Sequence, residues 1–71
     1  MPNSVKVRKV LDALYKLGFR GVRQKGSHVF FEHADGRTTS VPMHKEIRIK
    51  LLSKIIRKDL GMSSEDFFTL L

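Results

Sequence analysis

Cysteine and tryptophan are absent from this sequence, and long apolar runs are missing as well. Without cysteine the chain forms no disulfide bond and no thiolate metal site, which fits a reducing compartment. No apolar run approaches the ~18 residues of a membrane-spanning helix, and the N-terminus has no apolar signal core. The sequence therefore predicts a cytoplasmic protein that has no membrane partner.

Acidic residues are also scarce, with 14 Lys and Arg against 7 Asp and Glu and a net charge of +7 in 71 residues. All of the basic residues lie in residues 1–58, whereas residues 59–71 hold only acids among their charged side chains. Such an excess attracts phosphates whatever their sequence, so a nucleic acid is the expected partner. The alternative is a solvated surface that happens to be rich in lysine.

The short chain leaves room for one domain, residues 1–71, because a chain of this size buries only about 60% of its unfolded surface. A deep cofactor pocket is therefore not expected. Its three histidines, His28, His33 and His44, lack the i, i+4 spacing of a helical zinc pair, and no cysteine can complete a site. The Lys25-Gly26-Ser27 turn also lacks the upstream glycine of a P-loop. We expect no metal and no cofactor.

Apolar residues recur at helical spacing near both ends of the chain. The first helix is predicted over residues 4–17, with Asn3 or Ser4 as its N-cap and Gly18 as its stop.

A second helix is predicted to begin near Glu46 and to end at Gly61, where a glycine after the last apolar residue is typical of a helix end. Ser63 followed by Asp66 resembles a capping arrangement and predicts a short terminal helix.

Between these helices the pattern changes to short β-rich runs that turn residues separate. The three antiparallel strands are predicted at Phe19–Gln24, Ser27–His33 and Arg37–Val41, with turns at Lys25-Gly26 and Asp35-Gly36 and with Pro42 closing the third strand. The resulting α-β-β-β-α order, with a short C-terminal helix, predicts an α+β fold of two layers.

Side chains alternate along the second strand, so Val29 and Phe31 share one face and His28 and Phe30 share the other. Both faces contain apolar residues, and the sequence does not decide which of them meets the helices. If Val29 and Phe31 point inward, His28 lies on an open face. The alternative is that His28 is a half-buried strand residue whose ring makes an ordinary hydrogen bond.

An RNA substrate would make an exposed histidine chemically useful, because RNA carries its own nucleophile in the 2′-hydroxyl. An enzyme then needs only to move protons and to stabilise charge on the phosphate. Histidine, with an ordinary pKa near 6.5, does this at neutral pH. A second cationic segment, His44 to Lys50, lies where backbone N–H groups at a helix start could meet an anion.

Several motifs in this order and spacing resemble the HicA family, the toxins of the HicA–HicB toxin–antitoxin systems. The likeness covers nearly the whole chain. It rests on Leu17-Gly18-Phe19, Arg23-Gln24-Lys25-Gly26-Ser27-His28, Asp35-Gly36-Arg37, Val41-Pro42-Met43-His44 with Lys45-Glu46-Ile47, and Gly61-Met62-Ser63 with Glu65-Asp66-Phe67.

The resemblance implies a fold like the double-stranded-RNA-binding domain and an endoribonuclease, an mRNA interferase, that a HicB-type antitoxin inhibits. The family's catalytic histidine corresponds to His28 in the Gly26-Ser27-His28 motif, and His44 matches a second recurrent position. The chain departs from the usual pattern in two places. Val29 stands where members often carry a second histidine, and Ile49-Lys50 stands where members often have Pro-Gly.

The leading hypothesis is a metal-independent ribonuclease that cleaves mRNA with His28 as general acid or base. The turn at Gly26 would support the site. The residues expected to contact RNA are Arg23, Lys25, Ser27, His44, Lys45 and Arg48. The alternatives are a non-catalytic RNA-binding module and a protein-interaction domain whose basic face binds an acidic partner.

Overall fold

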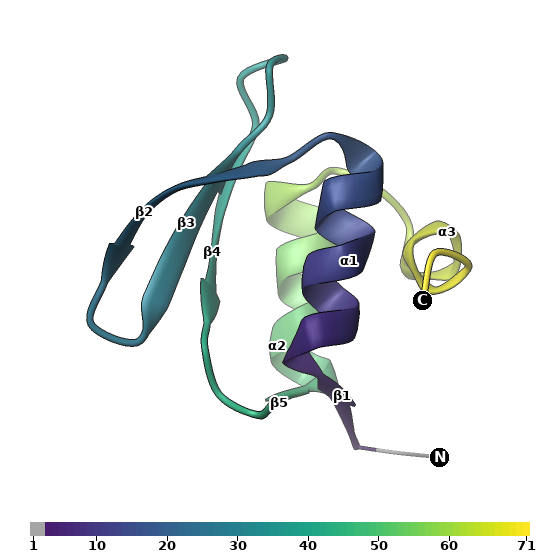
Figure 1. Cartoon of the computed structure of the whole chain (residues 1–71). Helices are drawn as coiled ribbons and strands as arrows, with labels where there is room; N and C mark the ends of the chain where they lie inside the picture. The colour runs from purple at the N-terminus through teal and green to yellow at the C-terminus, as the bar shows by residue number, and fades with distance from the viewer. Residues whose placement is uncertain (1–2) are drawn as a thin grey trace.

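The computed structural model describes residues 3–71 and shows an α+β fold in which a three-stranded antiparallel sheet lies beside the helices (Figure 1). The predicted α-β-β-β-α order and the short terminal helix are confirmed. In chain order the elements are β1 (Ser4–Lys6), α1 (Val7–Leu17), β2 (Arg20–Lys25), β3 (His28–Glu32), β4 (Thr38–Pro42), β5 (Glu46–Arg48), α2 (Ile49–Lys54), the π-helix η1 (Ile55–Asp59) and α3 (Ser64–Phe68).

The short strands β1 and β5 are the main departure from the sequence prediction. They pair antiparallel, with Val5 opposite Ile47, and form a separate two-stranded ladder. Both main helices begin directly after this ladder, so the predicted helix starts at residue 4 and near Glu46 are wrong. Backbone pairing between segments far apart in the chain competes with helix formation here, and three-residue strands are too short to show a pattern.

The predicted N-caps of the first helix are also wrong. Lys6 occupies the cap position without a side-chain hydrogen bond, and the Val7 N–H donates instead to the Lys45 carbonyl at 3.1 Å. The Ser4 hydroxyl, freed from capping, donates to the Glu46 carboxylate across the ladder. A tertiary contact therefore satisfies the backbone donor that a cap would have satisfied.

The ends of the helices follow the sequence prediction more closely. Gly18 ends α1 in the left-handed region with a φ of 101°, and Gly61 follows η1 with a φ of 65°. At the start of α3 the Ser63 hydroxyl accepts the Asp66 N–H at 3.1 Å, which confirms the predicted cap.

The three strands of the main sheet lie in the order β2-β3-β4, joined by two hairpins. Gly26 has a φ of 60° in the two-residue turn between β2 and β3. This turn pairs Lys25 with His28. On the other side of β3, Pro42 pairs with His28 as the last residue of β4, in agreement with its predicted role at the strand end.

The core lies between one face of this sheet and the two main helices. Phe31 and Val41 are buried, and Val29 packs against them. Fully burying a side chain of this kind stabilises the fold by about 1.5–3 kcal/mol. The side chains that point inward from β3 are therefore Val29 and Phe31, which settles the question that the sequence left open. The buried apolar residues are Val10, Ala13, Leu14, Phe19, Phe31, Val41, Ile47, Leu52, Ile55, Ile56, Leu60 and Phe67.

The last turn of the second helix is a π-helix, in which the Leu60 N–H donates to the Ile55 carbonyl at 3.0 Å. It places Asp59 beside the sheet, where one carboxylate oxygen accepts the hydroxyl of buried Thr39 at 2.8 Å. This hydrogen bond joins the end of the helix to β4.

Gly18 and Gly36 have nearly the same φ, so the two glycines together test the packing at the end of α1. A Cβ at residue 18 would lie 2.9 Å from the His33 Nε2 atom, whereas a Cβ at Gly36, with a φ of 100°, would have no atom within 4 Å. We expect Gly36→Ala to lower the free energy of unfolding by about 1–2 kcal/mol, through backbone strain alone. Gly18→Ala should lower it by ~1–3 kcal/mol more, because the added methyl group also collides with the His33 ring.

Urea unfolding of both variants measures this difference. An equal or smaller loss for Gly18→Ala would show that His33 does not constrain this position.

Candidate functional site

His28 is the first residue of β3, and its side chain is exposed on the face of the sheet that points away from the core, here called the open face. The hydrogen bonds that side chains form within residues 3–71 do not include the His28 ring. This placement agrees with the interpretation of His28 as an open-face residue and not with that of a hydrogen-bonded, half-buried one.

Two predicted contact residues of β2 share the open face with His28. Lys25 is directly opposite His28 in the strand register, and Arg23 is opposite Phe30. The Arg23 guanidinium lies over the Phe30 ring, 4.6 Å from its centroid. Residues paired in this way present their side chains to the same face, so the two cations and the imidazole lie together.

The second helix forms the other wall of a small hollow beside His28, with a volume of about 210 Å³. Lys54 and Lys58 bring two further cations to this wall, and the sequence does not indicate that they lie near His28. The sequence shows only that they share one helical stripe, because the residues at 51, 54, 55 and 58 follow the i, i+3, i+4, i+7 spacing. The lining residues are His28, Ser40, Pro42, Leu51, Lys54, Ile55, Lys58 and Asp59.

The hollow therefore has an imidazole from the sheet, two ammonium groups from the helix and the Asp59 carboxylate, which accepts the Thr39 hydroxyl. Phosphate oxygens accept hydrogen bonds from imidazole and ammonium groups, and bonds to charged donors are the stronger ones. A phosphodiester held here would lie against an imidazole, a group that can accept or donate a proton in catalysis. The arrangement can bind a phosphate group and transfer a proton to or from the bound phosphodiester.

The remaining predicted contact residues lie elsewhere on the surface. Ser27 is exposed in the turn before His28, His44 and Lys45 are exposed in the loop between β4 and β5, and Arg48 is the exposed last residue of β5. Lys45 lines a different hollow, and neither Lys45 nor Arg48 lines that of His28. The Ile49 N–H at the helix start donates to the Asn3 carbonyl at 2.9 Å, so it is not free for an anion.

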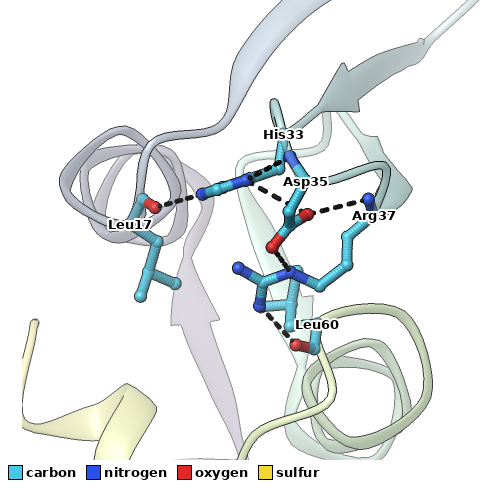
Figure 2. Close-up of polar contacts among 5 residues, drawn as sticks. All are labelled: Leu17, His33, Asp35, Arg37 and Leu60. Carbon is cyan, nitrogen blue, oxygen red and sulfur yellow. Dashed lines mark hydrogen bonds and ion pairs between the residues drawn. The ribbon is translucent and has the colours of Figure 1, made fainter.

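His33, just beyond the other end of β3, is bound by its neighbours (Figure 2). Its Nε2 atom lies 2.9 Å from the Leu17 carbonyl oxygen, and its Nδ1 atom accepts the Asp35 N–H at 3.0 Å. The Nδ1 atom also lies 3.1 Å from an oxygen of the Asp35 carboxylate, so Leu17 and Asp35 together contact both ring nitrogens. This ring also packs edge-on against Phe19, with 5.1 Å between the ring centroids. His33 is therefore a structural histidine.

Asp35 and Arg37 extend this contact to the end of the second helix. The Asp35 carboxylate accepts the Arg37 backbone N–H at 3.0 Å and the Arg37 Nε–H at 2.8 Å, while Arg37 Nη1 donates to the Leu60 carbonyl at 2.7 Å (Figure 2). The backbone hydrogen bond from Arg37 is the largest cause that lowers the pKa of the Asp35 carboxyl below its usual value. His33, Asp35 and Arg37, here called the hairpin cluster, join the β3–β4 turn to the ends of both main helices.

Residues 3–71 contain no group of three or more His, Cys, Asp or Glu side chains that could hold a metal ion. Nor does any helix in this part of the chain have the length and apolar character needed to cross a membrane.

These features define a small basic α+β domain with the layout of the double-stranded-RNA-binding fold and a histidine on its open sheet face. A family model described as the HicA toxin of bacterial toxin–antitoxin systems matches residues 7–62, which is most of the chain. The chain belongs to the HicA toxin family, as the sequence motifs indicate. A search of curated proteins gave no match.

The hairpin cluster predicts an acid-dependent part of the stability. Because the pKa of Asp35 is lowered in the folded protein, its charge contributes stability that is fully present above about pH 4, the ordinary aspartate range, and is lost as the pH falls through the folded-state value. Asp35→Asn keeps an oxygen that can accept the Arg37 N–H but removes the charge. We expect the parent to exceed Asp35→Asn in unfolding free energy at pH 5 by more than at pH 3.

Urea unfolding of both proteins at the two pH values measures this difference. A gap that is constant, or that widens in acid, would contradict the role assigned to the Asp35 charge.

Proposed function

We propose that this HicA-family toxin is a metal-independent endoribonuclease that cleaves mRNA, with His28 as general acid or base. The observation that carries the proposal is the exposed His28 ring, free of hydrogen bonds within residues 3–71, at a hollow that Lys54 and Lys58 also line. A histidine that supports only the fold is usually bound by its neighbours, as His33 is. His28 has instead the exposure that a substrate-facing group needs.

The proposed chemistry follows from RNA itself. The 2′-oxygen attacks the adjacent phosphorus, the bond from phosphorus to the 5′-oxygen breaks, and the 2′-hydroxyl proton is lost while the 5′-oxygen gains one. His28 would accept the first proton or supply the second, with solvent water as the other proton partner. The lysines would stabilise the negative charge that grows on the phosphate oxygens, a contribution that is large when donors are already in place.

A HicB-type antitoxin is the second proposed partner. The open face combines the proposed catalytic histidine with Arg23, Lys25 and the lysines of the second helix, so an acidic antitoxin surface would fit it by charge. An antitoxin bound there would exclude RNA.

A competition experiment, in which the antitoxin and RNA compete for the free toxin, would show whether the two partners bind the same surface of the toxin or separate surfaces.

His28→Ala tests the proposed catalytic role. We expect this variant to lose cleavage of a long single-stranded RNA in EDTA by at least about 100-fold, because positioned acid–base catalysis contributes ~10²–10⁴-fold. Its fold and its RNA affinity should stay close to those of the parent, because the ring is exposed and makes no intramolecular hydrogen bond within the described residues. Fragment analysis, circular dichroism and filter binding give the three readouts.

His44→Ala is the matched control, since His44 is also exposed but does not line the hollow. It should still cut RNA, with weaker binding at most. Full activity of His28→Ala would refute the catalytic role, and tight RNA binding without cutting by the parent would favour the non-catalytic binding module.

Removal of the helix cations tests the path of the RNA backbone. Lys54→Gln and Lys58→Gln should each weaken binding of single-stranded RNA and reduce the slope of log affinity against log salt by about 0.7. Arg57→Gln removes the same charge from the same helix, but Arg57 does not line the hollow, so its slope should stay near that of the parent. Equal effects of all three changes would indicate attraction by net charge alone.

A further inference from the structure

A second hollow of about 450 Å³ lies beside the hollow of His28, and both open-face residues of the sheet and the buried residues Phe31 and Thr39 line it. The two share Ser40 and Asp59 in their linings, so they are continuous along the edge where β4 meets the second helix. The proposed cleavage chemistry uses the first hollow and leaves the second one unexplained. Its lining residues are Val22, Arg23, Phe30, Phe31, Glu32, Thr38, Thr39, Ser40 and Asp59.

The second hollow contains an aromatic ring with a guanidinium group over it. Phe30 is only half-buried, and the Arg23 guanidinium covers its ring from the neighbouring strand at 4.6 Å. We call this pair the Arg23–Phe30 platform. Strand alternation puts Phe30 on the same face as His28, and the burial of Phe31 shows that this face is the open one. Unpaired nucleic-acid bases stack on aromatic rings and on guanidinium planes in many RNA-binding proteins.

Polar groups surround this platform. The side chains of Thr38, Ser40 and Glu32 line the same hollow, and they bring two hydroxyl groups and a carboxylate. Hydroxyls both donate and accept, whereas a carboxylate accepts only. The edges of nucleobases carry donors and acceptors of this kind, so the hollow offers both a stacking plane and partners for a base edge.

The spacing along β3 relates the two hollows to one nucleotide. His28 and Phe30 are two residues apart on the same face, which is about 6.6 Å along a strand. A base on the platform would therefore leave room for a phosphate of the same strand at His28. Lys54 and Lys58 line the hollow in which that phosphate would lie.

We propose that the second hollow is a nucleobase subsite, which holds one unpaired base next to the phosphate at His28. This inference rests on the proposed function, because it assumes that RNA binds the open face. It narrows the substrate class to single-stranded RNA, since a base within a duplex has its faces covered by stacked neighbours and its pairing edge occupied. The platform binds the base, and the polar groups around it select among base edges.

Binding of an RNA that cannot be cut tests the subsite apart from catalysis. A single-stranded oligonucleotide with 2′-O-methyl groups throughout has no 2′-hydroxyl nucleophile, and a matched oligonucleotide with abasic positions keeps the phosphates but lacks the bases. We expect the parent to bind the first at least ~10-fold more tightly than the second, given what stacking contributes per base.

Two conservative variants identify the platform. Phe30→Leu keeps an apolar side chain but removes the aromatic plane, and Arg23→Lys keeps the charge but removes the planar group. Each should reduce the preference for base-bearing RNA several-fold while leaving affinity for the abasic strand nearly unchanged. Phe68→Leu is the matched control, because Phe68 is an exposed aromatic residue on α3, away from the sheet (Figure 1), and should change neither affinity.

The outcomes separate this inference from the proposed function. No binding of either strand by the parent would overturn both. Equal binding of the two strands, or an unchanged preference in Phe30→Leu and Arg23→Lys, would overturn the base subsite and leave the phosphate contacts and the ribonuclease proposal standing. A preference that only the platform variants lose would establish the subsite.

Discussion

The rest of the structure depends on the alternation of side chains along β3, because the helices cover only one face of the sheet. Val29 and Phe31 take the covered face, since Phe31 fills the core and Val29 packs against it. His28 and Phe30 are then left on the open face by geometry alone. The same constraint that builds the core thus exposes the candidate catalytic ring, and the pairing of β2 with β3 adds Arg23 and Lys25 beside it.

The two histidines near the ends of β3 show how position decides what the same side chain does. His33 follows the strand on the covered side, where Leu17 and Asp35 bind both of its ring nitrogens. Through Asp35 and Arg37 it joins the β3–β4 turn to both main helices (Figure 2). His28 begins the strand on the other side and makes no such bond within the described residues. His33 joins the sheet to the helices, and in our proposal His28 transfers a proton during RNA cleavage.

The sequence predicted those features that depend on local chemistry. The turn at Gly26, the helix stop at Gly18 and the cap at Ser63 each follow from a single residue type in its place. The β1–β5 ladder was not predictable, because its strands have three residues each and pair across most of the chain. Nor could the sequence show that Lys54 and Lys58 line the hollow of His28, since that depends on how the second helix lies against β4.

The most direct test of the account follows the ring signals of the three histidines by NMR, assigned through single alanine variants, during titration with a 2′-O-methyl single-stranded RNA that cannot be cut. Our account predicts that the His28 signal moves as RNA binds and that the His33 signal, from a ring bound within the hairpin cluster, stays in place. A large change at His33 with an unmoved His28 would contradict the assignment of the open face as the RNA surface.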